Sequence, residues 1–332
     1  MAKVRITQEF VAEGLTEFDG TDITVAERRS PEPMGRDELI GDLAGYDAAI
    51  CLLTDKVDVA LLDANPQLKA VANVAVGFDN IDVPAATERG VVVLNTPDVL
   101  TNATADLAFA LILSVARRVP EGDAFLRAGK YHYWRLQQEQ LGLDVYGRTL
   151  GVFGLGKIGR GVVERARGGF NMTVLYHDKF RLDEATEREL GVQYVEFDEL
   201  LARSDYLSLH APLTDETRHA INADAFERMP DHAVLINSGR GPLVDEAALV
   251  QALREGKIAG AGLDVYEFEP RVVEGLTALR DRVVLLPHLG SATQETRVAM
   301  ARMAAAGVRD VLQGGRPNNV VNPEVFDRSR TA

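Results

Sequence analysis

Residues 149–159 read Thr-Leu-Gly-Val-Phe-Gly-Leu-Gly-Lys-Ile-Gly, and this stretch decides the fold. Thr149–Phe153 is an apolar run typical of a buried strand, and Gly154, Gly156 and Gly159 follow with GxGxxG spacing ahead of a helical pattern. One glycine permits a tight turn, one lets the backbone approach a pyrophosphate, and one lets helix and strand pack closely. The helix N-terminus then offers unpaired N–H groups to the phosphates. The stretch therefore predicts the dinucleotide-binding unit of an α/β domain.

An acidic residue at the spacing expected for a dinucleotide site indicates which cofactor binds. Asp178 lies 19 residues after Gly159, just past the predicted strand Thr173–Tyr176. A carboxylate there accepts hydrogen bonds from the ribose hydroxyls of NAD and repels the extra phosphate of NADP. Lys179 and Arg181 follow directly and could soften that discrimination. The sequence predicts NAD, with NADP as the less favoured alternative.

Short apolar runs alternate with helical patterns along almost the whole chain. Several runs are apolar at consecutive positions, which indicates parallel strands buried on both faces. A helical stretch at Asn102–Lys130, broken at Pro120, divides two such series, and another follows at Thr293–Leu312. A helix at Asp245–Glu255 is expected to end at Gly256. The predicted strands are Ala48–Leu53, Val71–Val76, Val91–Leu94, Thr149–Phe153, Thr173–Tyr176, Tyr206–Leu209, Ala233–Ile236, Ala261–Val265 and Val283–Leu286.

Composition excludes several classes of protein. The chain has 332 residues and a formal charge of −14, which suggests two domains and argues against nucleic acid or an anionic membrane as partner. The single cysteine, Cys51, permits no intrachain disulfide and no cysteine-based metal cluster, and we expect no metal. The most apolar segment, Ala105–Ala116, is shorter than the roughly 20 residues that span a membrane. We expect a soluble, cytoplasmic protein.

Three segments carry candidate catalytic residues. His288 follows the apolar run Val283–Leu286 and precedes small residues, which is where sites form in α/β folds. Arg240 lies between two glycines and could bind a carboxylate in a bidentate manner. Glu267 and Glu269 follow another strand, and a carboxylate near His288 would favour the imidazolium form. From the residues alone, a structural histidine, a surface ion pair and a solvated acidic turn remain open.

Six motifs, in order and spread over most of the chain, resemble the D-isomer-specific 2-hydroxyacid dehydrogenase family, closest to its glyoxylate and hydroxypyruvate reductases. They are NVAVGFDNID at 73–82, NTPDVLTNATADL at 95–107, the glycine motif, NSGRGPLVDE at 237–246, LDVYEFEP at 263–270 and PHLGSAT at 287–293. The resemblance implies that a small 2-keto acid, glyoxylate or hydroxypyruvate, is reduced by NADH to the D-2-hydroxy acid.

The resemblance also implies roles for single residues. Arg240 would hold the substrate carboxylate and carbonyl oxygen, His288 would act as acid and base, and Glu269 would pair with His288. Asp264 would bind the nicotinamide carboxamide, and Leu53, Val76, Gly77, Arg240, His288 and Ser291 would contact substrate. Leu52, Leu53 and Val76 would line the pocket for its side chain. The cofactor contacts would be Thr104, Gly154, Gly156, Lys157, Ile158, Gly159, Asp178, Lys179, Pro212, Thr217, Ser238, Gly239, Arg240, Asp264, His288 and Gly290.

The family fold implies two Rossmann-like α/β domains with parallel sheets and an active-site cleft between them. Residues 1–100 and 290–332 would form a discontinuous, flavodoxin-like substrate domain, and residues 101–289 the NAD-binding domain. An arm at about 102–146 would join two copies into a homodimer, and its Trp134 could reach the partner's site.

Other activities share this fold. A phosphite dehydrogenase has a lysine where Val76 stands, a phosphoglycerate dehydrogenase often has an additional C-terminal domain, and a formate dehydrogenase pairs its histidine with glutamine. An NADH-binding corepressor-like module would retain similar motifs. Turnover of 2-keto acids would distinguish a dehydrogenase from such a module.

Overall fold

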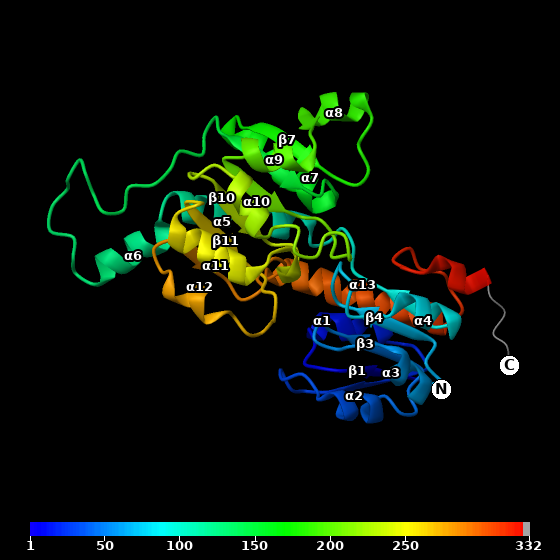
Figure 1. Ribbon diagram of the computed structural model, residues 1–332. Coiled ribbons are helices and arrows are strands. Elements are labelled where there is room, and N and C mark those ends of the chain that lie inside the picture. The colour runs from blue at the N-terminus through cyan, green and yellow to red at the C-terminus, as the bar shows by residue number, and fades with distance from the viewer. Residues whose placement is uncertain (328–332) are drawn as a thin grey trace. The chain divides into compact units, whose positions relative to one another are not determined.

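The computed structural model describes residues 1–327, and their contacts divide the chain into two units (Figure 1). The first unit comprises Met1–Leu100 and the described residues from Ala292 onward, and the second is Thr101–Ser291. Each unit contains one parallel β-sheet with helices, so the prediction of two α/β domains is confirmed. The assignment of the units as substrate domain and cofactor domain stays a prediction.

The sheet of the first unit has five strands in the order β2-β1-β3-β4-β5, and every neighbouring pair is parallel. This is the flavodoxin-like order, in which the strand order reverses between β1 and β3. Its strands are β1 (Ala2–Ile6), β2 (Ile23–Glu27), β3 (Ala48–Cys51), β4 (Ala70–Asn73) and β5 (Val92–Leu94), and its early helices are α1 (Ala12–Leu15), η1 (Thr16–Phe18), α2 (Arg36–Asp42), α3 (Val59–Ala64) and α4 (Val83–Glu88).

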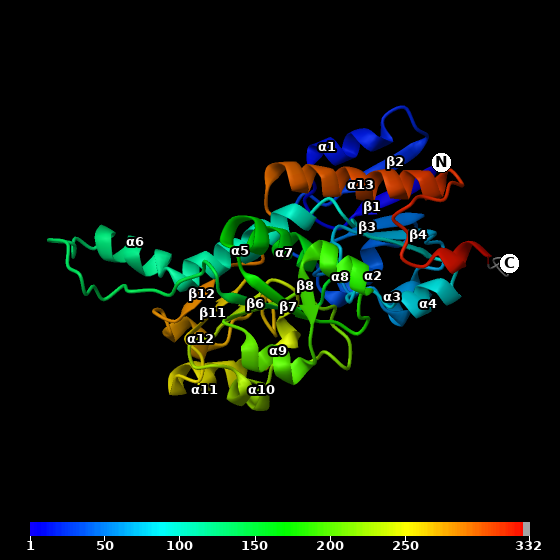
Figure 2. The ribbon, with the colours of Figure 1, turned by 90° about the horizontal axis from the view of Figure 1, so that it is seen from above.

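The end of the chain completes the first unit. Helix α13 (Gln294–Leu312) begins at the N-cap Thr293 and packs beside α1 against β3 and β4 (Figure 2). Asn322 is fully buried, where its side chain accepts the N–H of Val93 at 2.8 Å and donates to Thr87 and Val91, just before η3 (Pro323–Asp327). These bonds join segments more than 200 residues apart in sequence.

The sheet of the second unit has seven strands, again all parallel, in the order β12-β11-β10-β9-β6-β7-β8. The strand order reverses between β6 and β9, which is the switch point where ligands bind in doubly wound folds. The strands are β6 (Thr149–Phe153), β7 (Thr173–His177), β8 (Val192–Tyr194), β9 (Tyr206–Leu209), β10 (Val234–Asn237), β11 (Gly260–Leu263) and β12 (Val283–Leu285).

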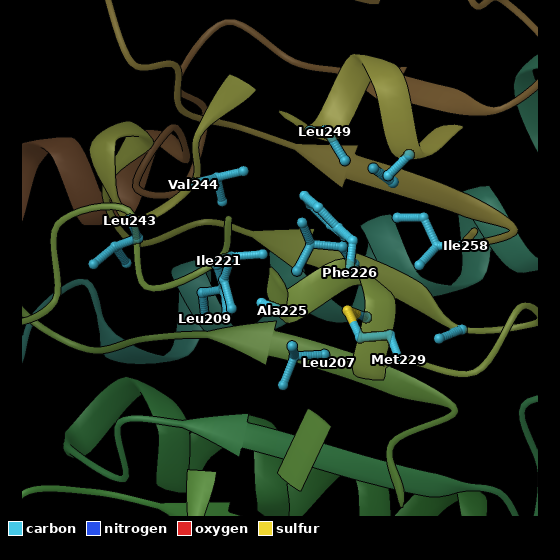
Figure 3. Close-up of a cluster of buried hydrophobic side chains, with 14 of the residues drawn as sticks. Leu207, Leu209, Ile221, Ala225, Phe226, Met229, Leu243, Val244, Leu249 and Ile258 are labelled. Carbon is cyan, nitrogen blue, oxygen red and sulfur yellow. The ribbon is translucent and has the colours of Figure 1, made fainter. Parts of the chain in front are cut away.

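Two cores cover the two faces of this sheet. Leu207, Leu209 and Leu235 point to one core, whereas their neighbours Tyr206 and Val234 belong to the other. The first core holds Phe226 of α10 and Leu249 of α11 (Figure 3), and the second lies under α5 and α7. The helices are α5 (Thr101–Ala116), α6 (Val119–Arg127), α7 (Lys157–Phe170), α8 (Glu184–Leu190), α9 (Phe197–Arg203), α10 (Ala223–Arg228), η2 (Gly241–Leu243), α11 (Glu246–Glu255) and α12 (Glu274–Ala278).

The predicted break at Pro120 needs a correction. Helix α5 ends at Ala116, and Pro120 lies inside the first turn of α6, where proline is tolerated. A proline has no N–H for the carbonyl four residues earlier, so the chain cannot continue α5 through it. That carbonyl, of Ala116, instead accepts the N–H of Leu143 at 2.7 Å. The break therefore lies at residues 117–118, ahead of the proline.

Residues 119–146, which we call the arm, extend away from the sheet of the second unit in both views (Figure 1, Figure 2). Helix α6 has no buried residue. Nine large apolar side chains of the arm are exposed: Val119, Leu126, Tyr131, Tyr133, Trp134, Leu136, Leu141, Leu143 and Tyr146. Separately, no helix within residues 1–327 has the length and apolar character needed to cross a membrane.

Candidate active site

The glycine motif forms the turn between β6 and α7 at the switch point. Gly154 has φ of 93°, and a Cβ on it would lie 2.4 Å from the backbone nitrogen of Ala211. A Cβ on Gly159 would lie 2.4 Å from the carbonyl oxygen of Gly154. Packing within the protein thus requires glycine at both positions, because a side chain would separate the loop from β9 and the helix from the strand.

Gly156 differs from the other two glycines. It is the exposed N-cap of α7, and a Cβ there would meet no atom within 4 Å. The fold itself therefore leaves this position open, at the helix end where backbone N–H groups favour anions. A second feature at the same sheet edge also fits a ligand: the hydroxyl of Ser238 is buried with no hydrogen-bond partner among residues 1–327. These residues fit the pyrophosphate and ribose of a dinucleotide.

Asp178 follows β7 and faces the glycine loop. Its carboxylate accepts the N–H of Leu155 at 2.7 Å and that of Phe180 at 3.2 Å. Of the two neighbouring cations, Lys179 lies 3.6 Å from Glu216 and Arg181 binds Glu187 at 2.9 Å. Both cations that could attract a 2′-phosphate thus have a carboxylate partner, while the negative charge of Asp178 lies at the loop.

The loop after β9 packs against the glycine turn. His210 begins it, and burial lowers the pKa of His210 to about 4, so the ring is neutral near pH 7. Its Nε2 lies 2.8 Å from the Ser208 hydroxyl. The Thr217 hydroxyl donates to the carbonyl of Pro212 at 2.7 Å and thereby closes the turn that contains both predicted cofactor contacts.

Arg240 is held by an asparagine that sequence analysis did not single out. After β10, the buried Asn237 side chain accepts the N–H of Gly239 at 3.1 Å and donates to the carbonyl of Arg240 at 2.9 Å. Arg240 is half-buried, and its Nη1 donates to the carbonyl of Gly239 at 3.0 Å. Asn237 stands in a quoted motif, three residues before Arg240, and that proximity was the available signal.

Asp264 fixes the backbone around His288. It is fully buried after β11, and its carboxylate accepts the N–H groups of Leu289 and Gly290 at 2.6 and 2.8 Å. Its carbonyl accepts the N–H of His288, which has φ of 56°. Burial raises the pKa of Asp264, against these amide bonds and the charge of His288. A Cβ on Gly290 would lie 3.3 Å from both Asp264 and Thr104, so these three predicted cofactor residues are neighbours.

His288 and Glu269 form an ion pair. The His288 Nδ1 lies 3.0 Å from Glu269 Oε2, and Glu269 Oε1 accepts the N–H of Tyr266 at 2.9 Å. Burial acts to raise the pKa of Glu269, but the hydrogen bond and charge of His288, aided by the charge of Arg240, outweigh it and hold that pKa below its ordinary value. Glu269 is therefore ionised at neutral pH, and an ionised carboxylate favours the imidazolium form of its partner.

Apart from Thr104 of α5, the site residues described above lie in segments that follow the carboxyl ends of parallel strands in one sheet. Residues 109–290 match the NAD binding domain of the D-isomer specific 2-hydroxyacid dehydrogenases, which is more than half of the chain. The chain belongs to the D-isomer specific 2-hydroxyacid dehydrogenase family. It is accordingly an NAD-binding oxidoreductase that acts on a CH–OH group, as the resemblance implied.

Relatives within this dehydrogenase family support the same assignment. A glyoxylate reductase of Korarchaeum cryptofilum is 45% identical over 97% of this chain and 96% of its own length. The crystal structure of a glyoxylate reductase from Paecilomyes thermophila is 36% identical with a TM-score of 0.86, covering 96% of this chain and 98% of that one. An NADPH-dependent glyoxylate/hydroxypyruvate reductase from Sinorhizobium meliloti is 35% identical with a TM-score of 0.84 and 99% coverage of both chains.

Three of the predicted substrate contacts of this dehydrogenase lie in the first unit. Leu53 follows β3, and Val76 and Gly77 follow β4. The Asn73 side chain donates to the carbonyl of Gly77 at 2.7 Å, and that of Asn95 donates to the carbonyl of Val76 at 2.8 Å. Among residues 1–327, the N–H groups of Val76 and Gly77 donate no hydrogen bond. The side chains of Asn73 and Asn95 thus hold this loop through its carbonyl groups, and the N–H groups of Val76 and Gly77 can donate to a ligand.

No group of three or more histidine, cysteine, aspartate or glutamate side chains within residues 1–327 could hold a metal ion. Of the remaining predicted contacts, Ser291 is half-buried at the end of the second unit, and Lys157 and Ile158 form the first turn of α7. Their contacts to substrate and cofactor stay predictions.

Proposed function

We propose that this dehydrogenase reduces glyoxylate to glycolate with NADH. The observation that carries the proposal is the ion pair of His288 and Glu269, which lies with Arg240 at the same sheet edge as the glycine loop. Relatives named glyoxylate reductase, 43–47% identical over most of the chain, support this substrate class. Bound NADH supplies a hydride to the carbonyl carbon, and the protein must supply a proton and stabilise charge on the carbonyl oxygen.

The three charged residues divide this work. The guanidinium of Arg240 binds the carboxylate of the keto acid and stabilises the negative charge that develops on the carbonyl oxygen. His288, as imidazolium, donates the proton to that oxygen, which then becomes the hydroxyl of the product. Glu269 keeps the imidazolium favoured and orients the ring through Nδ1, which leaves Nε2 for the substrate. In the reverse direction the neutral imidazole accepts the hydroxyl proton.

NADH is held by the residues around the switch point. We assign the pyrophosphate to Gly156 and the first turn of α7, and the adenosine ribose to Asp178. We expect Ser238, whose hydroxyl has no hydrogen-bond partner among residues 1–327, and Thr104 to be further cofactor contacts. Because Lys179 and Arg181 have carboxylate partners, we expect NADH to be preferred to NADPH. We also propose a cytoplasmic location, with which the single cysteine, Cys51, agrees, and which cell fractionation would test.

We expect the amides of Val76 and Gly77 to bind the substrate carboxylate and Leu53 to contact the substrate side chain. These groups favour small 2-keto acids, so hydroxypyruvate is the second candidate substrate. The test is steady-state kcat/KM for the reduction of glyoxylate, hydroxypyruvate and pyruvate with NADH and with NADPH. A separate assay measures the oxidation of phosphite with NAD and with NADP. We expect glyoxylate with NADH to give the highest value. Binding of NADH without turnover of any 2-keto acid would instead favour a corepressor-like module.

We propose further that the arm joins two copies of the chain into a homodimer. Nine large apolar side chains of residues 119–146 are exposed, and exposed apolar surface on this scale supports an interaction site. Sedimentation velocity should show a dimer for the wild-type chain and a monomer for the double variant Tyr133→Ala, Trp134→Ala. The matched control is Phe180→Ala, an exposed apolar residue outside the arm. A monomeric wild-type chain would refute the proposal.

A further inference from the structure

Two glutamates that have no part in the proposed reaction lie in the segments that contain Arg240 and Glu269. Glu267 belongs to the turn of Tyr266–Pro270 that contains Glu269, and Glu246 begins α11, six residues after Arg240. The side chain of Glu246 accepts the N–H of Glu267 at 2.8 Å. In return, the side chain of Glu267 accepts the N–H of Glu246 at 3.3 Å. Each carboxylate thus binds the backbone of the other residue, and we call this pair the clamp.

The clamp joins two segments whose backbones touch. A Cβ on Gly241, the residue after Arg240, would lie 1.9 Å from the carbonyl carbon and oxygen of Tyr266. The segment that follows Arg240 and the turn that contains Glu269 therefore pack with no space for a side chain. The two hydrogen bonds of the clamp fix their relative position, because a shift of either segment would break both bonds.

His219 contacts Glu267 of the clamp. His219 Nε2 lies 2.8 Å from Glu267 Oε1, and the N–H of His219 donates to the carbonyl of Pro242 at 2.8 Å. The loop of His219 therefore contacts both members of the clamped pair of segments. This second histidine–carboxylate pair forms through Nε2 of His219, whereas His288 contacts Glu269 through Nδ1.

The burial of Glu246 is the feature that a purely solvated acidic turn would lack. Glu246 is 2% exposed, and its Oε2 has no hydrogen-bond partner among residues 1–327. Burial, together with the charges of Glu267 and Glu269, raises the pKa of Glu246 against the backbone hydrogen bonds of Glu267 and Val273. A buried carboxyl in this setting is costly for stability unless its hydrogen bonds offset the cost, which indicates that its contact to Glu267 matters to the fold of this edge.

We propose that the clamp of Glu246 and Glu267 positions the Arg240 guanidinium and the Glu269 carboxylate relative to each other, so that both glutamates are positioning residues for the reduction. The inference rests on the proposed roles of Arg240 and Glu269. Arg240 holds the substrate and Glu269 orients the proton donor, so the distance between their segments sets the alignment of the carbonyl oxygen with His288. A misplacement of about 1 Å at such a site costs about 100-fold in rate.

The test compares three variants of the full chain. Glu246→Ala removes the acceptor for the N–H of Glu267, whereas Glu246→Gln keeps an amide oxygen there and mimics the neutral carboxyl. Glu255→Ala, at the exposed far end of the same helix, is the matched control. We expect kcat for glyoxylate to fall about 10- to 100-fold in Glu246→Ala, and to stay within about threefold of wild type in the other two. The Kd for NADH should not change.

The deuterium isotope effect separates positioning from loss of folded protein. With NADH deuterated at the transferred position, the isotope effect on kcat should rise in Glu246→Ala, because a misaligned hydride step becomes rate-limiting. A smaller fraction of folded enzyme would lower kcat and leave the isotope effect unchanged. Glu267→Ala removes the other half of the clamp and should give the same signature, so the test does not depend on one variant folding.

Three outcomes would overturn the proposal and are distinguishable from one another. Unchanged kcat and isotope effect in Glu246→Ala and Glu267→Ala, with an active wild-type enzyme, would refute the clamp alone. An equal loss in Glu246→Gln and Glu246→Ala would also refute it, because the hydrogen bond would then be irrelevant. A wild-type chain that turns over no 2-keto acid would refute the proposed function, and the clamp with it.

Discussion

Replacing Glu269 by glutamine is expected to move the pH range of keto-acid reduction downward while NADH binding stays the same. Glutamine keeps the size of the side chain and an oxygen that can accept the N–H of Tyr266, now bound at 2.9 Å. The substitution therefore removes chiefly the negative charge beside His288. In the wild-type enzyme this charge is present at neutral pH, because the hydrogen bond and charge of His288 outweigh burial and hold the pKa of Glu269 below its ordinary value.

The separation of the pair gives the size of the shift. The Glu269 carboxylate lies 3.0 Å from His288 Nδ1, and the two side chains are 36% and 34% exposed. Because solvent reaches both side chains, the effective dielectric constant is close to that of water, and two unit charges at this distance attract by about 1.4 kcal/mol. This corresponds to about one pH unit. Solvent and salt weaken an exposed pair below this value, so the pH at which reduction falls to half its maximum should decrease by less than about one unit when the carboxylate is removed.

The assay is initial-rate loss of NADH with glyoxylate across the pH range, together with glycolate oxidation by NAD. Reduction requires the imidazolium and oxidation the neutral ring, so both midpoints should move down together. Asp231→Asn is the control, because Asp231 lies 3.5 Å from His232 in an ion pair at the surface, away from the proposed site residues. Midpoints that stay in place in Glu269→Gln, or that move up, would show that the reasoning is wrong.

Four further substitutions test other parts of the site. His288→Gln should reduce kcat by about 100-fold or more, because the proton donor is lost, and full turnover would refute its role. NADH binding to that variant, followed by fluorescence, should be nearly unchanged. Gly156→Ala should leave the free energy of unfolding of the free enzyme unchanged and weaken NADH binding. Gly154→Ala should lower the free energy of unfolding, measured in urea, by about 2 kcal/mol or more, because the φ of Gly154 is 93° and a Cβ there would meet Ala211. Asp178→Asn keeps an acceptor for the N–H of Leu155 and should lower the kcat/KM preference for NADH over NADPH about tenfold, and an unchanged ratio would contradict the role of its charge.

Much of the fold could be predicted because buried parallel strands are apolar at consecutive positions. Residues 149–153 and 206–209 were predicted with the bounds that the structure shows. Strands β1, β2 and β8 were not predicted. β1 contains Lys3 and Arg5 among its five residues, while β2 and β8 are the edge strands of their sheets and are half-exposed. Since edge and alternating strands need no continuous apolar run, composition alone does not separate them from loops.

The candidate site could be predicted where one short motif contains all the information. Gly154, Gly156 and Gly159 belong to one turn, and Arg240 and His288 each follow a strand directly. The clamp could not be predicted, because Glu246 and Glu267 are 21 residues apart and His219 is 48 residues from Glu267. The alternation of Glu267 and Glu269 with aromatic residues is equally typical of a solvated turn and of a pair of positioning carboxylates. Only the packing of Gly241 on Tyr266 brings these side chains together.

The crowding of carboxylates around Arg240 bears on how an acidic enzyme binds an anionic substrate. With a net charge of −14, the field of the whole chain repels a keto acid, so attraction must be local. Three glutamates near Arg240 would cancel that attraction if all were ionised and unpaired. Glu269 and Glu267 each pair with a histidine, and burial with their charges raises the pKa of Glu246, which favours its neutral form. The arrangement thus gains three carboxylates that accept positioning hydrogen bonds, and their histidine partners have different parts: His288 is proposed to transfer the proton, whereas His219 holds Glu267 at 2.8 Å in the clamp.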